Sequence, residues 1–234
     1  MTYLTRDFEA NKVLKGQGST AHITQLPDIP GEAPLLHSRR EQALIVDTTI
    51  KKGFGFLPKG TVLAKSVASD YLVPYAALGS DYWKSPAVSD VANEASTIRV
   101  MKDEAYIFEV GESLILEQDG ETYHDGGAIT AVDMDSSEVF ADITFTNATG
   151  AAAGFTVANN TKCYLKAGTT GKFSEAVCVL DKSMDTGFGE YAVGGNASII
   201  LSNAVFYEHG LWNLDDSGKT ALNGYNIGRF FVIR

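Results

Sequence analysis

Residues 57–65, LPKGTVLAK, and residues 175–181, EAVCVLD, are the stretches that decide the fold of this chain. In the first stretch, Pro58 takes the second position and Gly60 the fourth position of a turn, which is the pattern of a type I turn. The β-branched and apolar residues that follow the turn favour a strand. Residues 175–181 have the same strand-like composition. The chain is therefore predicted to be built on strands that are joined by tight turns.

Further strands are predicted along most of the chain. The Asp119-Gly120 pair indicates a hairpin turn, and residues 134–137 are predicted to join two further antiparallel strands. A single helix is predicted over residues 86–96, with Ser85 as its cap and Pro86 at the first helical position. Together these patterns predict an all-β protein. The other predicted strands cover residues 43–50, 61–67, 71–75, 105–110, 113–117, 128–133, 138–145, 197–202, 204–208 and 229–234.

The composition of the chain restricts its class. Its 234 residues are 44% hydrophobic and 21% charged, and they carry a net charge of −10. This length is enough to bury a core without disulfides or metals. Because a strongly acidic chain repels phosphate backbones, a nucleic-acid partner is not expected. No membrane partner is expected either, since the chain has no apolar run of 18 residues. The first residues lack the apolar stretch of a secretory signal, which favours synthesis in a cytoplasm.

Residues 1–42 differ from the rest of the chain. They hold three of the six prolines and are neutral, with five basic and five acidic residues, so the remainder carries the whole −10. No apolar periodicity persists here, so the stretch is predicted to be an extended arm that becomes ordered on a partner. A disordered tail is the alternative. The apolar residues chosen as contacts of this arm are Tyr3, Leu4, Phe8, Val13, Leu14, Ile23 and Leu26.

Residues 103–166 are predicted to form a separate small antiparallel barrel, because short strands and turns follow one another at close spacing. Within them, residues 103–142 hold twelve acidic side chains and no lysine or arginine. Such a block is predicted to be a solvated face. It argues against contact of this unit with nucleic acid or with an anionic membrane.

The sequence contains no set of residues in the spacing of a catalytic site, so no enzyme activity and no cofactor are predicted. The cysteines, Cys163 and Cys178, do not form a CxxC pair and are predicted to be core residues on neighbouring strands, with a disulfide as the alternative. Asp133, Asp135 and Glu138 offer oxygen ligands that would suit calcium, but the glycine and the distal glutamate of an EF-hand are missing. A polar hairpin turn is therefore favoured, and no metal site is predicted.

Two separated parts of the chain resemble one known family. Residues 57–65 and 71–75 (YLVPY) resemble the front half of the head decoration, or capsid cement, proteins of tailed bacteriophages, the lambda gpD-like group. Residues 175–181 and 198–205 (SIILSNAV) resemble the back half. The sequence departs from the family pattern at Cys178 and at Asn203, where glycine is usual. The resemblance covers roughly a third of the chain.

The resemblance implies an all-β fold: a β-tulip or β-barrel-like decoration core with an inserted small antiparallel β-barrel and an extended N-terminal arm. The arm would be residues 1–42, the first half of the core 43–100, the inserted barrel 101–168, and the second half of the core 169–234. It further implies a virion protein that assembles in the host cytoplasm. The protein would bind the outer surface of the capsid, with the major capsid protein and further copies of itself as partners, as trimers at threefold positions. Its arm would add main-chain pairing to the coat and so stabilise the lattice.

Two other functions remain open from the sequence. The chain has the composition of a tail, fibre or baseplate module of a virion as well. It is also compatible with an enzyme or a metal-dependent binding domain that uses Asp133, Asp135 and Glu138 of the acidic unit as ligands.

Overall fold

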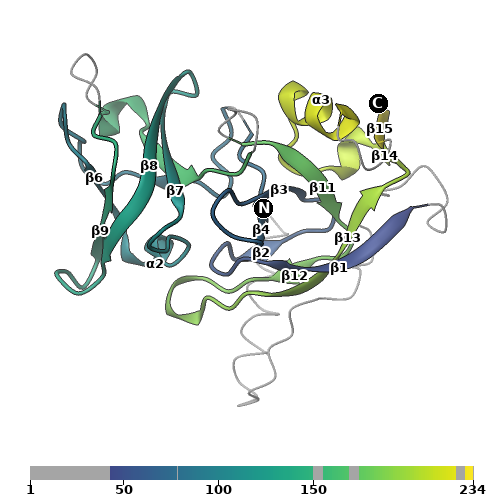
Figure 1. Ribbon diagram of the computed structural model, residues 1–234, viewed down its shortest axis with the longest axis horizontal. Helices are drawn as coiled ribbons and strands as arrows, with labels where there is room; N and C mark the ends of the chain where they lie inside the picture. Colours follow the sequence, from purple (N-terminus) through teal and green to yellow (C-terminus); the bar gives the residue numbers. More distant parts are fainter. Residues whose placement is uncertain (1–42, 78, 150–154, 169–173, 225–229, 234) are drawn as a thin grey trace, which may run out of the picture.

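Two β bodies lie side by side in this protein (Figure 1). The computed structural model describes residues 43–77, 79–149, 155–168, 174–224 and 230–233. The first body is a closed five-stranded barrel, and the second is a six-stranded sheet. The prediction of an all-β fold with a barrel-like core is confirmed. The predicted arm, residues 1–42, lies outside the described residues.

The barrel has the strand order β1-β13-β11-β3-β4. Residues 57–65 and 175–181 meet in this barrel, because β3 and β11 are antiparallel neighbours with Leu63 opposite Cys178. A parallel contact between Ile50 of β1 and Leu72 of β4 closes the ring. Its strands are β1 (Leu44–Ile50), β3 (Val62–Lys65), β4 (Leu72–Pro74), β11 (Ala176–Leu180) and β13 (Gly195–Ser202).

The turn that leads into β3 is shifted by one residue from its predicted position. The backbone N–H of Thr61 donates to the carbonyl of Pro58 at 3.1 Å, so the turn spans residues 58–61. Gly60 is then its third residue and has φ +85°. A positive φ at that position is typical of a type II turn, which favours glycine there.

The second body, called here the six-stranded body, has the order β5-β10-β7-β8-β9-β6, and all its strand pairs are antiparallel. An isolated bridge between Ala87 and Val100 joins its two edges, so the sheet is nearly closed. The strands are β5 (Ser85–Pro86), β6 (Thr97–Met101), β7 (Ser113–Gln118), β8 (Thr122–Asp133), β9 (Phe140–Phe145) and β10 (Lys162–Leu165). Because β5 and β6 belong to this sheet, it begins near residue 85 and not at the predicted boundary of 101.

The predicted hairpins of this body are confirmed. Asp119 and Gly120 both have positive φ, +53° and +70°, which is the geometry of a type I′ turn between β7 and β8. The strands β8 and β9 pair across residues 134–139, and Val132 lies opposite Ile143.

Two predicted elements are wrong. No helix forms over residues 86–96, because Ser85 pairs with Cys163 of β10 and Val91 bridges to Phe155. Long-range pairing therefore outweighs the local cap signal. Residues 105–110 are not a strand either. They follow the short helix α2 (Lys102–Ala105) through a turn in which the N–H of Phe108 donates to the carbonyl of Ala105.

The remaining elements lie around the barrel. A two-stranded sheet pairs β2 (Phe56–Leu57) with β12 (Met184–Asp185), and a second one pairs β14 (Ala204–Tyr207) with β15 (Phe230–Ile233). The helix α3 (Asp216–Gly224), which the sequence reading missed, begins after Asp215, whose carboxylate accepts from the N–H of Gly218. Such an N-cap is its local sequence signal. Single 3-10 turns are η2 (Val157–Asn159), η3 (Gly189–Tyr191) and η4 (Glu208–Gly210).

The hydrophobic core connects the two bodies. One cluster of buried side chains contains Val62 and Val179 of the barrel together with Leu114 and Phe145 of the six-stranded body. The two cysteines are buried and free, as core residues, but they lie in different sheets and not on neighbouring strands: Cys163 is in β10 and Cys178 in β11. Burial raises the pKa of both thiols, which makes them poor nucleophiles.

Candidate binding site

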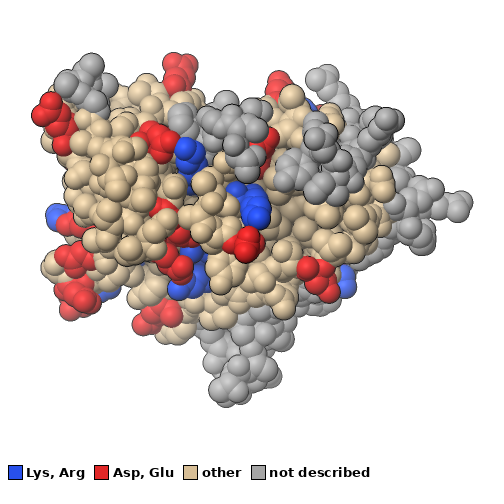
Figure 2. Space-filling view, in the orientation of Figure 1, with Lys and Arg blue, Asp and Glu red and all other residues tan. Residues whose placement is uncertain are grey.

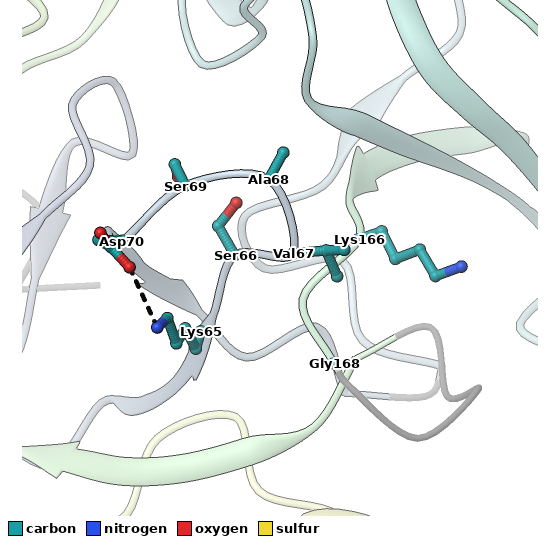
Figure 3. Close-up of a pocket in the computed structure, with 8 residues that line it drawn as sticks. All are labelled: Lys65, Ser66, Val67, Ala68, Ser69, Asp70, Lys166 and Gly168. Carbon is teal, nitrogen blue, oxygen red and sulfur yellow. Dashed lines mark ion pairs between the residues drawn. The ribbon is translucent and has the colours of Figure 1, made fainter.

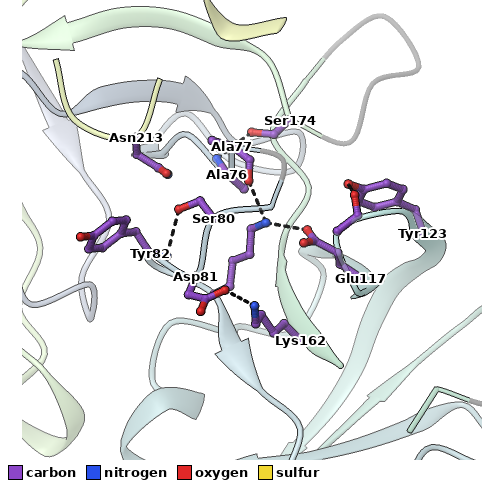
Figure 4. Close-up of polar contacts among 12 residues, drawn as sticks. Ala76, Ala77, Ser80, Asp81, Tyr82, Glu117, Tyr123, Lys162, Ser174 and Asn213 are labelled. Carbon is purple, nitrogen blue, oxygen red and sulfur yellow. Dashed lines mark hydrogen bonds and ion pairs between the residues drawn. The ribbon is translucent and has the colours of Figure 1, made fainter. Parts of the chain in front are cut away.

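The junction between the barrel and the six-stranded body is held by a buried ion pair (Figure 4). The ammonium of Lys84, in the segment that connects the bodies, lies 2.6 Å from the carboxylate of Glu117 in β7. The side chain of Lys84 is fully buried, and that of Glu117 is 2% exposed. Lys84 also donates to the carbonyl of Ala77 at 2.8 Å and lies 5.1 Å from the centre of the Tyr164 ring. Burial lowers the pKa of Lys84, and the contact with Glu117 opposes that shift.

Three further ion pairs, made by two lysines, cross the same junction. Lys162 of β10 contacts Asp81 of the connecting segment. At the end of β1, the buried Lys51 lies 2.9 Å from Glu112 and 3.3 Å from Glu109, which precede β7. Ion pairs of Lys51, Lys84 and Lys162 therefore attach the six-stranded body to the barrel and to the segment that connects the two bodies.

These pairs correct the prediction that residues 103–142 are a solvated acidic face. Acidic side chains do gather over the six-stranded body in the view of Figure 2. Glu112 and Glu117, however, are buried. Their lysine partners come from outside the acidic block, where no local pattern could reveal them.

An aromatic cleft opens beside this junction. Its volume is about 290 Å³, and four aromatic residues are among those that line it: Phe54, Tyr82, Trp83 and Phe188. Tyr82 and Phe188 are 57% and 49% exposed. Tyr82 also meets Trp212 edge-on, with ring centres 6.4 Å apart. The other lining residues are Gly53, Asp81, Lys84, Ser85, Glu104 and Ile107.

The backbone at the cleft is strained. Trp83 has φ +59°, a left-handed conformation that a bulky side chain rarely adopts. Strain of this kind costs of order 1–3 kcal/mol and is concentrated at functional sites. Trp83 is one of the residues that line the cleft, so the strained backbone lies at the cleft itself.

One carboxylate oxygen in the lining of the cleft lacks a hydrogen-bond partner among the described residues. Within the described part of the chain, the buried Oε2 atom of Glu104 has no hydrogen-bond partner. Burial, with a smaller contribution from the neighbouring Asp103, raises the pKa of Glu104 to about 7. This carboxyl is thus poised to change its charge near neutral pH.

The raised pKa of Glu104 predicts how stability depends on pH. Between about pH 4.5 and 7 the folded protein binds more protons than the unfolded chain, so stability is lost as the pH rises through this window. We expect Glu104→Gln to remove that loss. The variant should melt about 2–4 °C above the wild-type protein at pH 8, after allowance for solvent screening of this half-buried group.

Thermal melts of both proteins at pH 4.5 and pH 8 test this expectation. At pH 4.5 the two melting temperatures should coincide, because the wild-type carboxyl is then protonated. The control is Glu138→Gln, which changes an exposed acid outside the cleft and should leave both melting temperatures in place. An equal shift for Glu104→Gln at both pH values would contradict the assignment.

A second hollow, of about 560 Å³, lies at the loop that follows β3 (Figure 3). Its lining includes Lys65 and Lys166, but both ammonium groups have partners. Lys65 lies 3.2 Å from Asp70, and Lys166 lies 2.5 Å from Asp125. With its charges paired and without an aromatic side chain in its lining, this hollow is the weaker candidate.

The residues that the sequence analysis selected fall into two groups, the arm and the acidic loop, and the structure describes only the second. The arm residues Tyr3, Leu4, Phe8, Val13, Leu14, Ile23 and Leu26 all lie outside the described part of the chain.

The acidic loop that offered oxygen ligands forms a turn. The carboxylate of Asp133 accepts from the backbone N–H groups of Asp135 and Ser136, at 3.0 Å each. Glu138 is exposed. Among the described residues, no three His, Cys, Asp or Glu side chains come together as metal ligands.

Comparison with known proteins does not extend this picture. No family model, curated protein or solved structure matches the chain. No helix in the described ranges has both the length and the hydropathy to cross a bilayer.

The aromatic residues of the cleft were missed by the sequence reading. Tyr82 and Trp83 lie in a stretch that gave no clear pattern, although two adjacent aromatic residues in a polar loop are a signal that could have been followed.

Proposed function

We propose that this protein is a virion head decoration protein that attaches to the capsid through its N-terminal segment. The single observation that carries the proposal is the incomplete strand pairing of β1 within the described part of the chain, at the place where that segment joins the barrel. All seven residues of β1 pair with β13, whereas β4 meets β1 only at Ile50. In the described part of the chain, no strand pairs with the other edge of residues 44–49.

Such an edge is a template for strand addition. Natural edges are commonly protected by lysine, proline or a covering element. The sequence of residues 44–49, LIVDTT, contains neither lysine nor proline. An extended segment of the coat can therefore pair there by β-augmentation, in which main-chain hydrogen bonds supply affinity.

The composition of residues 1–42, the predicted arm, supports the same function. Fully extended, these residues would span at most about 150 Å, so they could contact the coat well away from the barrel. Their spaced apolar residues provide the side-chain contacts that a purely solvated linker lacks. Many copies on one shell would add these contacts together and strengthen the lattice. Trimers at threefold positions of the capsid are part of this proposal.

The proposal is tested by co-sedimentation with heads that lack this protein, prepared from the phage that encodes it. The full chain is compared with a chain that lacks residues 1–26, and with a full-length triple variant carrying Tyr3→Ser, Leu4→Ser and Phe8→Ser. We expect saturable binding by the full chain, no binding after the deletion, and at least a tenfold weaker affinity for the triple variant.

A matched control changes polar residues of the same segment: Thr2→Ser, Thr5→Ser and Asn11→Ser should bind as well as the original chain. Binding of undiminished strength after the deletion would refute attachment through the arm. If the full chain bound isolated tails and not heads, the proposal would give way to a tail, fibre or baseplate module.

A further inference from the structure

We infer that the aromatic cleft binds an arginine or lysine side chain presented by a segment of another protein. This inference does not depend on the proposed attachment to capsids. It rests on the shape of the cleft, on its aromatic walls and on the charge that remains unpaired within it.

The dimensions of the cleft suit one long side chain. Its volume of about 290 Å³ is small for an organic cofactor. Phe54, Tyr82 and Phe188 are among the residues that line it, so the aliphatic stem of a basic residue would find apolar side chains there.

The charges in and around the cleft select a cation. Lys84 forms an ion pair with Glu117, and Asp81 forms one with Lys162. Among the residues that line the cleft, the buried Oε2 atom of Glu104 has no hydrogen-bond partner within the described part of the chain, and Asp103 next to it adds negative charge. A ligand with a negative charge would be repelled, whereas an ammonium or guanidinium group would pair with the carboxylate.

The aromatic walls favour the same ligand. The face of an aromatic ring carries negative charge density and attracts cations that lie over it. Arginine gains most from such a site, since its planar guanidinium both stacks on rings and pairs with a carboxylate. The exposed rings of Tyr82 and Phe188 are thus placed to hold a basic side chain whose charged end reaches Glu104.

The occupant is assigned to another protein for a reason of charge. Two lysines of the described surface are already in ion pairs, Lys52 with Glu109 and Lys219 with Glu208, so a second copy would have to break such a pair to offer either of them to the cleft. A net charge of −10 attracts basic partners and accelerates their encounter.

The test titrates the intact protein with N-acetyl-arginine amide, and binding is followed by the NMR signals of the two tryptophan indole N–H groups. N-acetyl-citrulline amide is the matched probe, because it has nearly the same shape without the charge. We expect saturable shifts with the arginine probe and at least a tenfold weaker response with citrulline.

Variants locate the binding. Glu104→Gln and Phe188→Ala should each weaken the arginine response at least fivefold, while Glu138→Gln and Tyr71→Ala, which alter an acid and an exposed aromatic residue outside the cleft lining, should not change it. Since Phe188 is exposed, its variant should fold even if the Glu104 variant does not.

Three results would overturn the inference. The first is no saturable shift with the arginine probe, and the second is an equal response to citrulline. The third is self-association that sedimentation velocity detects and that Glu104→Gln abolishes, since this would assign the cleft to a second copy of the chain.

Discussion

Replacing Glu117 by alanine is expected to lower the free energy of unfolding by about 3–5 kcal/mol. Glu117 is 1% exposed, and its carboxylate lies 2.6 Å from the ammonium of Lys84, whose side chain is fully buried. Without the carboxylate, Lys84 keeps one hydrogen bond, to the carbonyl of Ala77, but its charge is left uncompensated in the interior. Most of the loss is the cost of that buried charge.

Urea unfolding of the variant and of the original protein measures this effect. The double variant Lys84→Met and Glu117→Leu is the informative control, because it removes both charges and keeps side-chain volume. It should recover most of the lost stability, since an apolar pair often replaces a buried ion pair without net cost. Glu138→Ala, at an exposed acid, should change the free energy of unfolding by less than about 0.5 kcal/mol. A loss below about 1 kcal/mol for Glu117→Ala would contradict the role of this ion pair.

Replacing Phe145 by alanine is expected to cost a similar amount, about 3–5 kcal/mol. Phe145 is the last residue of β9 and is 2% exposed. Its ring packs closely over the backbone of Gly126 in β8 and lies 6.4 Å, between ring centres, from His124, and it shares one core cluster with Phe155. Removing it leaves a cavity that these neighbours can fill only in part.

The same variant shows whether the two bodies unfold together. Phe145 belongs to a core cluster that also contains Val62 and Val179 of the barrel, so we expect one cooperative transition at a lower denaturant concentration. Tryptophan fluorescence and far-UV circular dichroism should give the same midpoint. Val139→Ala, at a half-exposed side chain of the β8–β9 connection, is the control and should barely move it. Two separate transitions would show that the bodies fold independently.

Local patterns in the sequence predicted many elements correctly. The Asp119-Gly120 turn forms because both residues accept positive φ, and the flanking strands β7 and β8 follow in register. The strands β3 and β11 were predicted from composition alone. The stretch from residue 85 to 96 shows the opposite case. Its serine cap and proline favour a helix locally, but pairing of Ser85 with Cys163, far along the chain, makes it part of a sheet.

Local sequence patterns could not predict the candidate site. The cleft joins Phe54, Trp83, Glu104 and Phe188, which come from four separate segments of the chain. No spacing rule links them. The left-handed backbone of Trp83 is likewise a consequence of its place in the fold.

The sequence by itself determined the class of this protein: a β protein with a net charge of −10, a hairpin turn at Asp119-Gly120 and a chemically distinct first 42 residues. Only the tertiary structure decided which charges are buried. Glu112 and Glu117 belong to a block that looks solvated, yet they pair in the interior with Lys51 and Lys84. The physical reason is the separation along the chain between the residues that interact. Turns and strand composition depend on neighbours along the chain, whereas a charge is buried only where folding brings an opposite charge to it, here across 33 residues for Lys84 and Glu117.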